Sequence, residues 1–449
     1  MGRRRTRSAP AAPIELAVDA LAHDGRGIGR VEGKTAFIHN ALPGERVRYQ
    51  RWRKRRDYDE GDALEVLQPS PDRVTPPCAH FGVCGGCALQ HLAPAAQREA
   101  KAAGLLENLQ RIGGVQPARV LPPLAGPALG YRRKARLAVK DVPAKGRVLV
   151  GFRERRAPYV ADCQRCEVLH PQVGALLLPL SALIGGLGIR TQLPQIEVAV
   201  ADNATALVLR VLAPPSASDR AQLAAFAETH GLQIFLQHGG PESLEPLTGP
   251  PPPLAYELPD FDLEMHFTPT QFTQINHEIN RQMVQQAIDL LAPAPDWRVL
   301  DLFCGIGNFT LPLARHAGCV HGIEGAAELV SQAEYNGRRH GIDNVSFSVA
   351  DLYTPPAGGA APADLPAWAR TGVDGVLLDP PRSGAEAILP WLARTGPRRI
   401  VYVSCHPATL ARDAGRLVGE HGYRLAAAGI MDMFPHTAHV ESMALFERD

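Results

Sequence analysis

A cysteine near the C-terminus is the side chain of this sequence best placed to act as a nucleophile. Cys405 follows the run Ile400–Ser404, which is rich in β-branched and aromatic residues and therefore predicts a strand. A buried cysteine is more often a small apolar residue than a nucleophile. Here, however, Pro407 indicates a turn just after the strand, where an α/β sheet can meet its ligand. We therefore predict that Cys405 reacts as a thiolate.

Acids and histidines beyond Cys405 could supply the base that such a nucleophile needs. Glu441 lies on a predicted C-terminal strand and is the base that we favour, although a lone glutamate is more often an ion-pair partner. His436 and His439 are alternative bases, and His406 could tune the thiolate. A nucleophile and a proton acceptor are thus predicted within one C-terminal segment.

A glycine turn predicts a second site, one for a cofactor. The apolar run Val299–Leu302 predicts a buried strand, and it leads through Gly305 and Gly307 into a predicted helix. Glycines at such a turn let the backbone approach a ligand closely, with a helix N-terminus behind them. A dinucleotide fingerprint would require glycine where Thr310 stands, so the turn disfavours NAD.

Acidic residues follow the next strands of the same segment. Glu324 follows the strand Cys319–Ile323 and could accept hydrogen bonds from ribose hydroxyls. Asp351 follows the strand at 345–349 and is placed for an adenine edge. Asp379 follows the strand at 375–378. Each acid alone could be an ordinary surface residue, but together they predict a ligand at the carboxyl edge of a sheet that also carries Cys405.

The elements that must position these residues alternate between helix and strand from Phe272 onward. This alternation predicts βαβ units, a mainly parallel sheet and an α/β fold. Earlier in the chain, residues 12–68 contain short β-rich runs separated by glycine and proline turns, which predict a small barrel. The expected barrel strands are Ile14–Val18, Gly29–Val31, Thr35–His39 and Val47–Gln50.

A basic run on the predicted barrel indicates an RNA partner. The net charge is only +1, but residues 1–60 hold 14 Lys and Arg against eight Asp and Glu. Residues 51–56 combine five cations with Trp52. Cations bind phosphates and aromatic rings stack on unpaired bases, so this combination favours RNA. A solvated hairpin loop is the alternative for the run, and a solvated tail is the alternative for the first arginines.

A group of cysteines predicts a metal site. Cys78, Cys84 and Cys87 have close ligand spacing, and Cys163 and Cys166 follow much later. Four thiolates could hold zinc or an iron–sulfur cluster, and the spacing does not decide between them. No signal peptide is expected, and the uncharged stretch Val173–Ile189 is too interrupted to span a membrane. We therefore expect a cytoplasmic protein, in which cysteines serve metals or catalysis before disulfides.

The length of 449 residues predicts two or three domains. A helix is expected over 95–111, an apolar helix near 172–186, and a linker at 250–253. We assign four regions: a basic tail (1–11), the barrel (12–70), a central α+β domain with the cysteines (71–262), and the domain that carries Cys405 (263–449). A monomer is expected.

These motifs together resemble the 23S rRNA uracil-C5 methyltransferases of the RNA m5U methyltransferase family, over nearly the whole chain. The N-terminal motifs D-G-R-G-I-G-R (24–30) and A-L-P-G-E (41–45) resemble a TRAM domain, an OB-like RNA-binding barrel. Further matches are F-T-Q-I-N (272–276), D-L-F-C-G-I-G-N-F (301–309), P-A-T-L-A-R-D (407–413), D-M-F-P-H-T (432–437) and H-V-E-S-M (439–443). The chain departs from the family pattern at His406, where Asn is expected, and at Asp351, which can be Asn.

The resemblance implies a Rossmann-like S-adenosylmethionine methyltransferase domain over 263–449 and an iron–sulfur cluster in the central domain. It implies Cys405 as nucleophile and Glu441 as general base. The implied cofactor contacts are Gln274, Phe303, Asn308, Glu324, Asp351 and Asp379. The implied [4Fe-4S] ligands are Cys78, Cys84, Cys87 and Cys166, which leaves Cys163 as an additional thiol.

The activity that the resemblance implies is methylation of C5 of uridine 1939 in 23S rRNA. Uracil C5 is too weak a nucleophile to attack a methyl sulfonium directly. Addition of the Cys405 thiolate to C6 creates an enolate whose C5 can take the methyl group, after which Glu441 removes the C5 proton and cysteine is eliminated. The alternatives are a tRNA uracil methyltransferase, a related enzyme for another rRNA uracil, and a non-catalytic RNA-binding protein.

Overall fold

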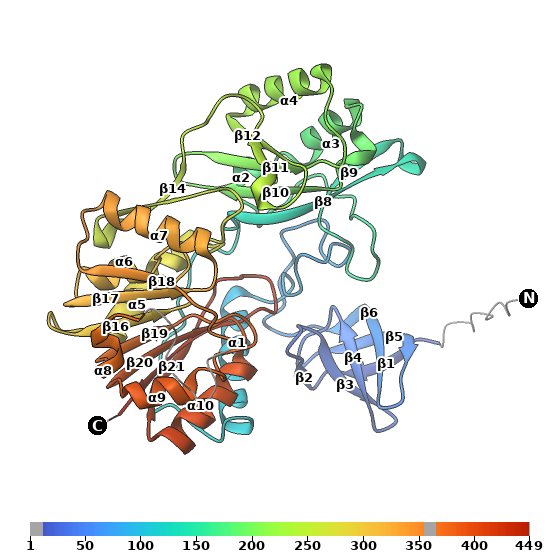
Figure 1. Ribbon diagram of the computed structural model, residues 1–449. Helices are drawn as coiled ribbons and strands as arrows, with labels where there is room; N and C mark the ends of the chain where they lie inside the picture. The colour runs from blue at the N-terminus through green and yellow to red at the C-terminus, as the bar shows by residue number, and fades with distance from the viewer. Residues whose placement is uncertain (1–11, 354–364, 449) are drawn as a thin grey trace, which may run out of the picture. The chain divides into compact units, whose positions relative to one another are not determined.

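The computed structural model describes residues 12–353 and 365–448, so the predicted basic tail lies outside the described residues. Figure 1 traces the elements along the chain. The described chain divides into two compact units. The first contains the residues up to Lys101 together with Glu154–Ala157 and Pro435–His439, and the second contains the rest.

The first unit contains a six-stranded barrel. The sheet order is β1-β5-β6-β4-β3-β2, and its strands are β1 (Ile14–Ala17), β2 (Ala20–Leu21), β3 (Gly27–Val31), β4 (Lys34–His39), β5 (Arg46–Lys54) and β6 (Tyr58–Gln68). β1 lies at one end of this order, where it pairs with β5, and β2 lies at the other end, where it pairs with β3. Only two residues separate β1 from β2 along the chain, so the two ends of the sheet meet and the sheet closes. Small and aliphatic side chains fill its interior around the buried ring of Tyr49. A Cβ at Gly61 would overlap that ring, so β6 requires glycine there.

The four predicted barrel strands are present, and two strands were not predicted. β2 has two residues, and β6 has eleven with acidic residues near its start. β6 lies beside β5 and neutralises part of the basic run: Arg51 pairs with Asp59 at 3.0 Å and Arg53 with Glu60 at 3.4 Å. Most of the basic run 51–56 therefore lies in β5 and forms cross-strand ion pairs, and only its last two residues lie beyond the strand.

The second unit contains two larger sheets and a hairpin. One sheet has six strands in the order β13-β12-β11-β10-β8-β9: β8 (Lys134–Val142), β9 (Arg147–Gly151), β10 (Gln195–Val200), β11 (Thr205–Arg210), β12 (Leu232–Gln237) and β13 (Leu244–Pro246). Its helices are α2 (Pro171–Gly174), α3 (Leu177–Gly186) and α4 (Ala217–His230), so the apolar helix expected near 172–186 is divided in two. The hairpin is β14 (Leu254–Leu258) and β15 (Leu263–Phe267). Short 3-10 turns lie at Pro143–Lys145, Arg190–Gln192, Pro241–Ser243 and Pro259–Phe261.

The other sheet of the second unit has eight strands in the order β18-β17-β16-β19-β20-β22-β21-β7. Five are parallel, as the helix–strand alternation predicted: β16 (Arg298–Leu302), β17 (Cys319–Glu324), β18 (Val345–Val349), β19 (Gly375–Leu378) and β20 (Arg399–Ser404). β22 (Glu441–Glu447) runs antiparallel to β20, and it is followed by β21 (Arg424–Met431) and the short β7 (Arg119–Val120). All five parallel strands therefore end at one edge, where Glu324 is the last residue of β17 and where Asp379 and Cys405 follow β19 and β20.

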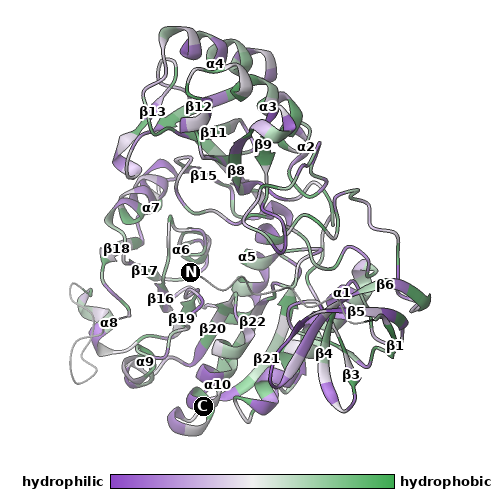
Figure 2. Ribbon diagram, turned by 90° about the vertical axis from the view of Figure 1, so that its right-hand side faces the viewer, coloured by the Kyte–Doolittle hydropathy of each residue, from purple (hydrophilic) through white to green (hydrophobic). Residues whose placement is uncertain are grey.

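Helices surround this eight-stranded sheet, and their apolar faces fill its core. They are α1 (Pro94–Arg111), α5 (His277–Leu291), α6 (Thr310–Ala314), α7 (Ala327–Arg339), α8 (Ala367–Thr371), α9 (Leu389–Thr395) and α10 (Pro407–His421). α1 agrees with the helix predicted at 95–111, and it contributes Leu105 and Leu109 to the core. Figure 2 shows hydrophobic residues along β20, β21 and β22, whose side chains are almost all buried. Within the described ranges, no helix is long and apolar enough to cross a bilayer.

Candidate active site

The glycine turn after β16 is held against the end of β17. The backbone amides of Phe303 and Cys304 both donate to the Ile323 carbonyl, at 2.9 and 3.1 Å. Phe303 has a left-handed backbone with φ of 65°, and Gly305 and Gly307 have φ of 55° and 89°. A left-handed residue other than glycine costs on the order of 1–3 kcal/mol. Strain of this kind is typical of a ligand-binding turn and agrees with the cofactor site predicted here.

Glu324 and Asp351 are both anchored by backbone amides beside this turn. Glu324 Oε2 accepts from Gly305 N at 3.1 Å, and its Oε1 accepts from the amides of Gly325 and Ala326 at 2.7 and 3.1 Å. Asp351 is exposed, and its Oδ1 accepts from Tyr353 N at 2.8 Å. The Tyr353 ring lies 5.6 Å from the Phe303 ring. The ends of β17 and β18 therefore place two carboxylates and two aromatic rings around one turn.

Asn308 is engaged mainly by other side chains of the protein. Its Oδ1 accepts from the Tyr256 hydroxyl at 2.8 Å and from Asn280 Nδ2 at 3.0 Å, and its Nδ2 donates to Asn280 Oδ1 at 2.9 Å. The side chain of Asn308 thus joins the glycine turn to β14 and α5. Gln274 is half-buried in the segment that precedes α5.

A buried carboxyl group that was not among the predicted site residues lies on β16, just before the turn. Asp301 is fully buried, and its Oδ2 accepts from Thr310 Oγ1 at 2.5 Å. Within the described residues its other oxygen has no hydrogen-bond partner. Burial raises the pKa of Asp301 to about 8, and the charges of Asp379 and Glu324 add to the effect. The signal that could have identified it was an acid inside the apolar run Val299–Leu302.

Cys405 and Glu441 lie across from each other at the end of the β20–β22 ladder. The last paired residues are Ser404 and Ser442, and Ser442 Oγ donates to the Ser404 carbonyl at 3.1 Å. In an antiparallel register the next residue of β20 faces the preceding residue of β22, so Cys405 is opposite Glu441. Cys405 is half-buried and Glu441 is 7% exposed. The structure therefore brings the predicted nucleophile and the preferred base to the same point.

Burial raises the pKa values of the acids at this point, and for Glu441 the charge of Asp379 adds to the effect. Burial raises the pKa of Asp379 to about 7 and the pKa of Glu441 to about 8. Burial also raises the pKa of Cys405 to about 11, and the charges of Glu441 and Asp379 act in the same direction while Arg382 opposes them. The thiol is therefore protonated at neutral pH in this structure. The negatively charged forms of Asp379, Glu441 and Cys405 are all disfavoured here, so the site is suited to bind a cation.

The three histidines considered in the sequence analysis, His406, His436 and His439, make the following contacts. His406 is exposed and caps the N-terminus of α10, where its Nδ1 accepts from Thr409 N at 3.4 Å. His436 belongs to the first unit, where its Nδ1 lies 3.1 Å from Gln97 Nε2 and its carbonyl accepts from the amides of Ala88 and Leu89. His439 N donates to Thr437 Oγ1 at 3.2 Å. The roles considered for His406, His436 and His439 stay predictions.

The predicted metal site does not form a recognisable group. Among the residues that the structure describes, no three Cys, His, Asp or Glu side chains come together as a metal site. Cys84 Sγ accepts from Gly86 N at 3.4 Å, as a sulfur in a ligand loop can. Cys163 is buried, and Cys78, Cys84, Cys87 and Cys166 are partly buried. The iron–sulfur cluster therefore stays a prediction.

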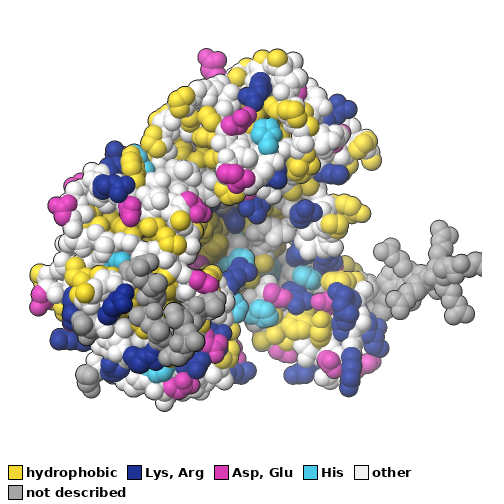
Figure 3. Space-filling view, in the orientation of Figure 1, with side chains coloured by type: hydrophobic (Ala, Val, Ile, Leu, Met, Phe, Trp, Pro, Cys, Tyr) yellow, Lys and Arg dark blue, Asp and Glu magenta, His cyan; other side chains and the backbone are white. Residues whose placement is uncertain are grey.

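The first unit also contains a pocket of about 480 Å³ beside the basic strand. Its positive potential is evident at His39, where burial and the charges of Arg155, Arg156 and Arg26 lower the pKa to about 3. Arg156 lies over the Trp52 ring at 4.9 Å. Figure 3 shows further Lys and Arg side chains over the barrel. The pocket is lined by Asp24, Gly25, Arg26, His39, Asn40, Trp52, Arg53, Glu60, Gly85, Cys87, Ala88, Arg155 and Arg156.

Two family models match the chain. A tRNA (uracil-5-)-methyltransferase model matches residues 256–449, and a TRAM domain model matches residues 13–48. The barrel is thus a TRAM domain, and the matched strands lie where the sequence predicted them.

Curated relatives match along the full length. The chain is 56% identical over 450 residues to the 23S rRNA (uracil(1939)-C(5))-methyltransferase RlmD of Alkalilimnicola ehrlichii, covering 100% of this chain and 99% of the relative. It is 50% identical to the protein of the same description from Methylococcus capsulatus, covering 100% of both chains.

A solved structure has the same fold. The tRNA (uracil-54, C5)-methyltransferase of Pyrococcus abyssi, in complex with S-adenosyl-L-homocysteine, superposes with a TM-score of 0.70 at 22% identity. The match covers 96% of this chain and 100% of that chain. The α/β domain therefore has the Rossmann-like methyltransferase fold that the sequence predicted.

Proposed function

The chain belongs to the family of 23S rRNA (uracil-C5)-methyltransferases, and from this premise we propose how its residues methylate C5 of a uridine in 23S rRNA, uridine 1939. The observation that carries the proposal is the meeting of Cys405 with Glu441 at the end of the β20–β22 ladder. A nucleophile and a base at one point are what methylation of a pyrimidine carbon needs. S-adenosylmethionine supplies the methyl group as a sulfonium.

The acids at the sheet edge support a site for that methyl donor. Asp379 and Glu441 both have raised pKa values, so a positively charged ligand relieves their repulsion. We assign Glu324 and Asp351 to the nucleoside and Phe303 to stacking, because Phe303 belongs to the strained turn and the two acids lie at the ends of the neighbouring strands. Gln274 and Asn308 complete the predicted set of cofactor contacts. We assign Asn308 an indirect role, because its side chain holds the glycine turn in place.

The chain's residues then perform three steps. The Cys405 thiol first loses its proton to solvent. The Sγ thiolate then bonds to C6 of the uracil, and the electrons of the C5–C6 double bond move onto the C4 carbonyl to give an enolate. C5 forms its bond to the methyl group, and the methyl–sulfur bond breaks. Glu441 takes the proton from C5, the double bond re-forms, and the bond from Cys405 to C6 breaks. The nucleophile leaves as a thiolate, which closes the cycle.

The barrel pocket supports a contact to the RNA away from the reacting base. Trp52 offers a ring face for an unpaired base, and Arg155 and Arg156 supply charge for phosphates. We assign this pocket to the same 23S rRNA.

The cysteine segment is assigned to a [4Fe-4S] cluster on Cys78, Cys84 and Cys87, with Cys166 as the fourth ligand. Its support is the ligand spacing and the amide that donates to Cys84 Sγ. Iron and acid-labile sulfide, assayed in protein purified without oxygen, should approach about four each per chain. Stoichiometric zinc without iron would reject the assignment.

The function is tested by mapping 5-methyluridine in RNA from cells that lack the gene. We expect the modification to disappear from uridine 1939 of 23S rRNA, to return with the wild-type gene, and to stay absent with Cys405→Ala. Loss from tRNA alone, or restoration by Cys405→Ala, would reject the proposal. Glu228→Gln, an exposed change on α4, serves as the control that restores the modification.

A further inference from the structure

A buried carboxylate connects the two active-site segments, and we propose that Asp413 is a positioning residue for the reaction. It fixes the loop that follows Asp379 to the helix that follows Cys405. This inference rests on the proposed function, because it concerns the same nucleophile and the same sheet edge.

Asp413 lies on α10 and is fully buried. Its Oδ2 accepts from the backbone amide of Ala385 at 2.8 Å and from the hydroxyl of Tyr402 at 2.7 Å. The Tyr402 hydroxyl also accepts from the Ala385 amide at 3.0 Å, and the Tyr402 ring is fully buried. Three segments thus meet at one carboxylate: β20, α10 and the loop after β19.

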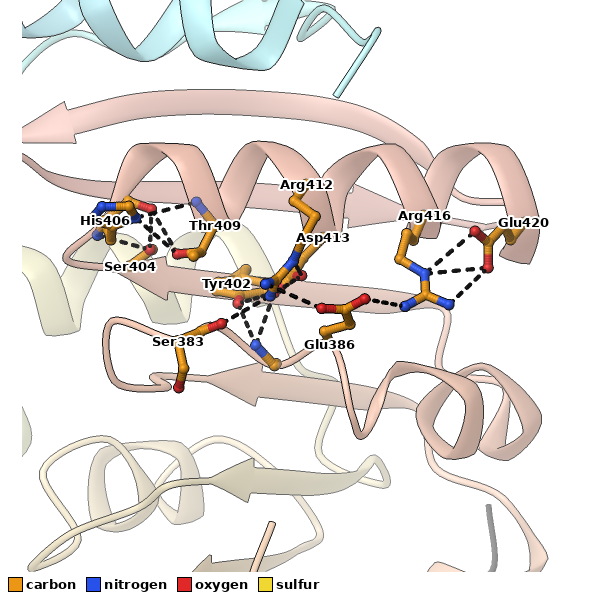
Figure 4. Close-up of polar contacts among 11 residues, drawn as sticks. Ser383, Glu386, Tyr402, Ser404, His406, Thr409, Arg412, Asp413, Arg416 and Glu420 are labelled. Carbon is orange, nitrogen blue, oxygen red and sulfur yellow. Dashed lines mark hydrogen bonds and ion pairs between the residues drawn. The ribbon is translucent and has the colours of Figure 1, made fainter. Parts of the chain in front are cut away.

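Arg412 adds a second connection between the same helix and the same loop. Its Nε and Nη2 lie 2.8 and 2.7 Å from Asp413 Oδ1, and its Nη2 also donates to the Ser383 carbonyl at 2.9 Å. Its Nη1 pairs with Glu386 at 3.1 Å. Figure 4 shows these contacts between the helix and the loop, with Arg416 and Glu420 at the far end.

Gly384 makes this close approach possible. Its φ is 81°, and a Cβ there would lie 2.6 Å from both Asp413 Oδ2 and Arg412 Nη2. A side chain at this position would therefore displace the carboxylate or the loop. The close packing of the loop against α10 therefore depends on glycine at position 384 opposite Asp413.

The position of the loop matters because its residues act on the nucleophile. Ala385 follows Asp379 by six residues, Tyr402 precedes Cys405 by three, and Asp413 follows it by eight. The charge of Asp379 raises the pKa of the Cys405 thiol and the charge of Arg382 lowers it. A movement of the loop by about 1 Å would change the distances from Asp379 and Arg382 to the Cys405 thiol. Misplacements of that size can reduce a rate about 100-fold.

The decisive variants are Tyr402→Phe and Asp413→Asn in the full-length protein. Tyr402→Phe keeps the buried ring and removes only the hydroxyl, so it tests the network even where Asp413→Asn does not fold. Single-turnover methylation of a 23S rRNA fragment should slow at least tenfold for Asp413→Asn and about threefold or more for Tyr402→Phe. The KM for RNA should stay within about threefold, with melting temperatures well above the assay temperature.

The double variant separates positioning from simple loss of stability. If both side chains act through one carboxylate, the double variant should be no slower than Asp413→Asn alone. Glu420→Gln is the control, because Glu420 pairs with Arg416 on the exposed end of the same helix.

A wild-type single-turnover rate in Tyr402→Phe would overturn the proposal, as would rate losses that multiply in the double variant. Failure of the proposed function would look different, since the wild-type protein itself would then leave the rRNA unmethylated.

Discussion

Glu441 occupies a place where its negative charge is costly, so replacing it by a neutral side chain should stabilise the protein at high pH. The carboxyl group is 7% exposed, and Asp379 repels its charged form. Glu441→Gln keeps the size of the side chain and removes the charge. The same substitution removes the proposed base, so stability and activity should change in opposite directions.

The magnitude and its sign follow from the raised pKa. In the unfolded chain the pKa of Glu441 is about 4.5, and in the folded protein burial raises it to about 8. The folded state therefore binds more protons between these values, and stability falls as pH rises through that range. At 1.36 kcal/mol per pKa unit, the cost above pH 8 is at most about 5 kcal/mol, because water that enters the site reduces it.

The assay is thermal unfolding of wild type and Glu441→Gln at pH 5, 7 and 9. At pH 5 the two proteins should melt within about 2 °C of each other, because Glu441 is then protonated in the folded state. At pH 9 the variant should melt several degrees higher, since each kcal/mol corresponds to about 2–4 °C for a domain of this size. Glu228→Gln, which alters an exposed carboxyl group, should show no such pH-dependent difference.

Equal melting temperatures at pH 9 would refute the reasoning. Glu441 would then be charged without cost, either through solvent that reaches it or through a cation that compensates it. The arrangement of Cys405 and Glu441 across the strand ladder would remain, but the electrostatic description of the site would be wrong.

Three further predictions concern the other parts of the site. Glu441→Gln should accumulate a covalent protein–RNA adduct on denaturing gels, because addition and methylation precede the lost deprotonation; turnover without adduct would give Glu441 another role. Trp52→Ala should weaken binding to the rRNA fragment roughly 5- to 150-fold, as the loss of one stacked base does, and an unchanged affinity in filter binding would remove the pocket from the RNA surface. Asn280→Ala should destabilise the protein by about 1–3 kcal/mol, because it leaves the amide of Asn308 without its acceptor; unchanged urea unfolding would contradict this.

The sequence predicted the sheet edge well because strand ends are local features. Short apolar runs followed by Glu324, Asp379 and Cys405 place acids and a thiol at one edge of any parallel sheet. The register that sets Cys405 opposite Glu441 is not local, since it depends on how β22 pairs with β20. Sequence reasoning could propose the two residues but not their juxtaposition.

Contacts between distant segments account for what the sequence did not predict. The barrel strand β6 begins with acidic residues that read as a polar loop until β5 supplies their partners. The role of Asn308 depends on Asn280 and Tyr256, which lie 28 and 52 residues earlier. Asp413 is the last residue of the motif P-A-T-L-A-R-D (407–413), yet its proposed function depends on a backbone amide of another loop.

The raised pKa values also suit the order of the proposed steps. The methyl donor carries a positive charge, which lowers the pKa of Glu441 and of Cys405 while it is bound. Methyl transfer would convert that sulfonium into a neutral thioether, and the pKa of Glu441 would then rise again, because burial and Asp379 still disfavour its charged form. The carboxylate thus becomes a stronger base just after methylation, when the C5 proton must be removed. On the proposed mechanism, loss of the donor's charge would favour the last step. A donor that stays positively charged after it has given up its methyl group should therefore leave the RNA attached to Cys405.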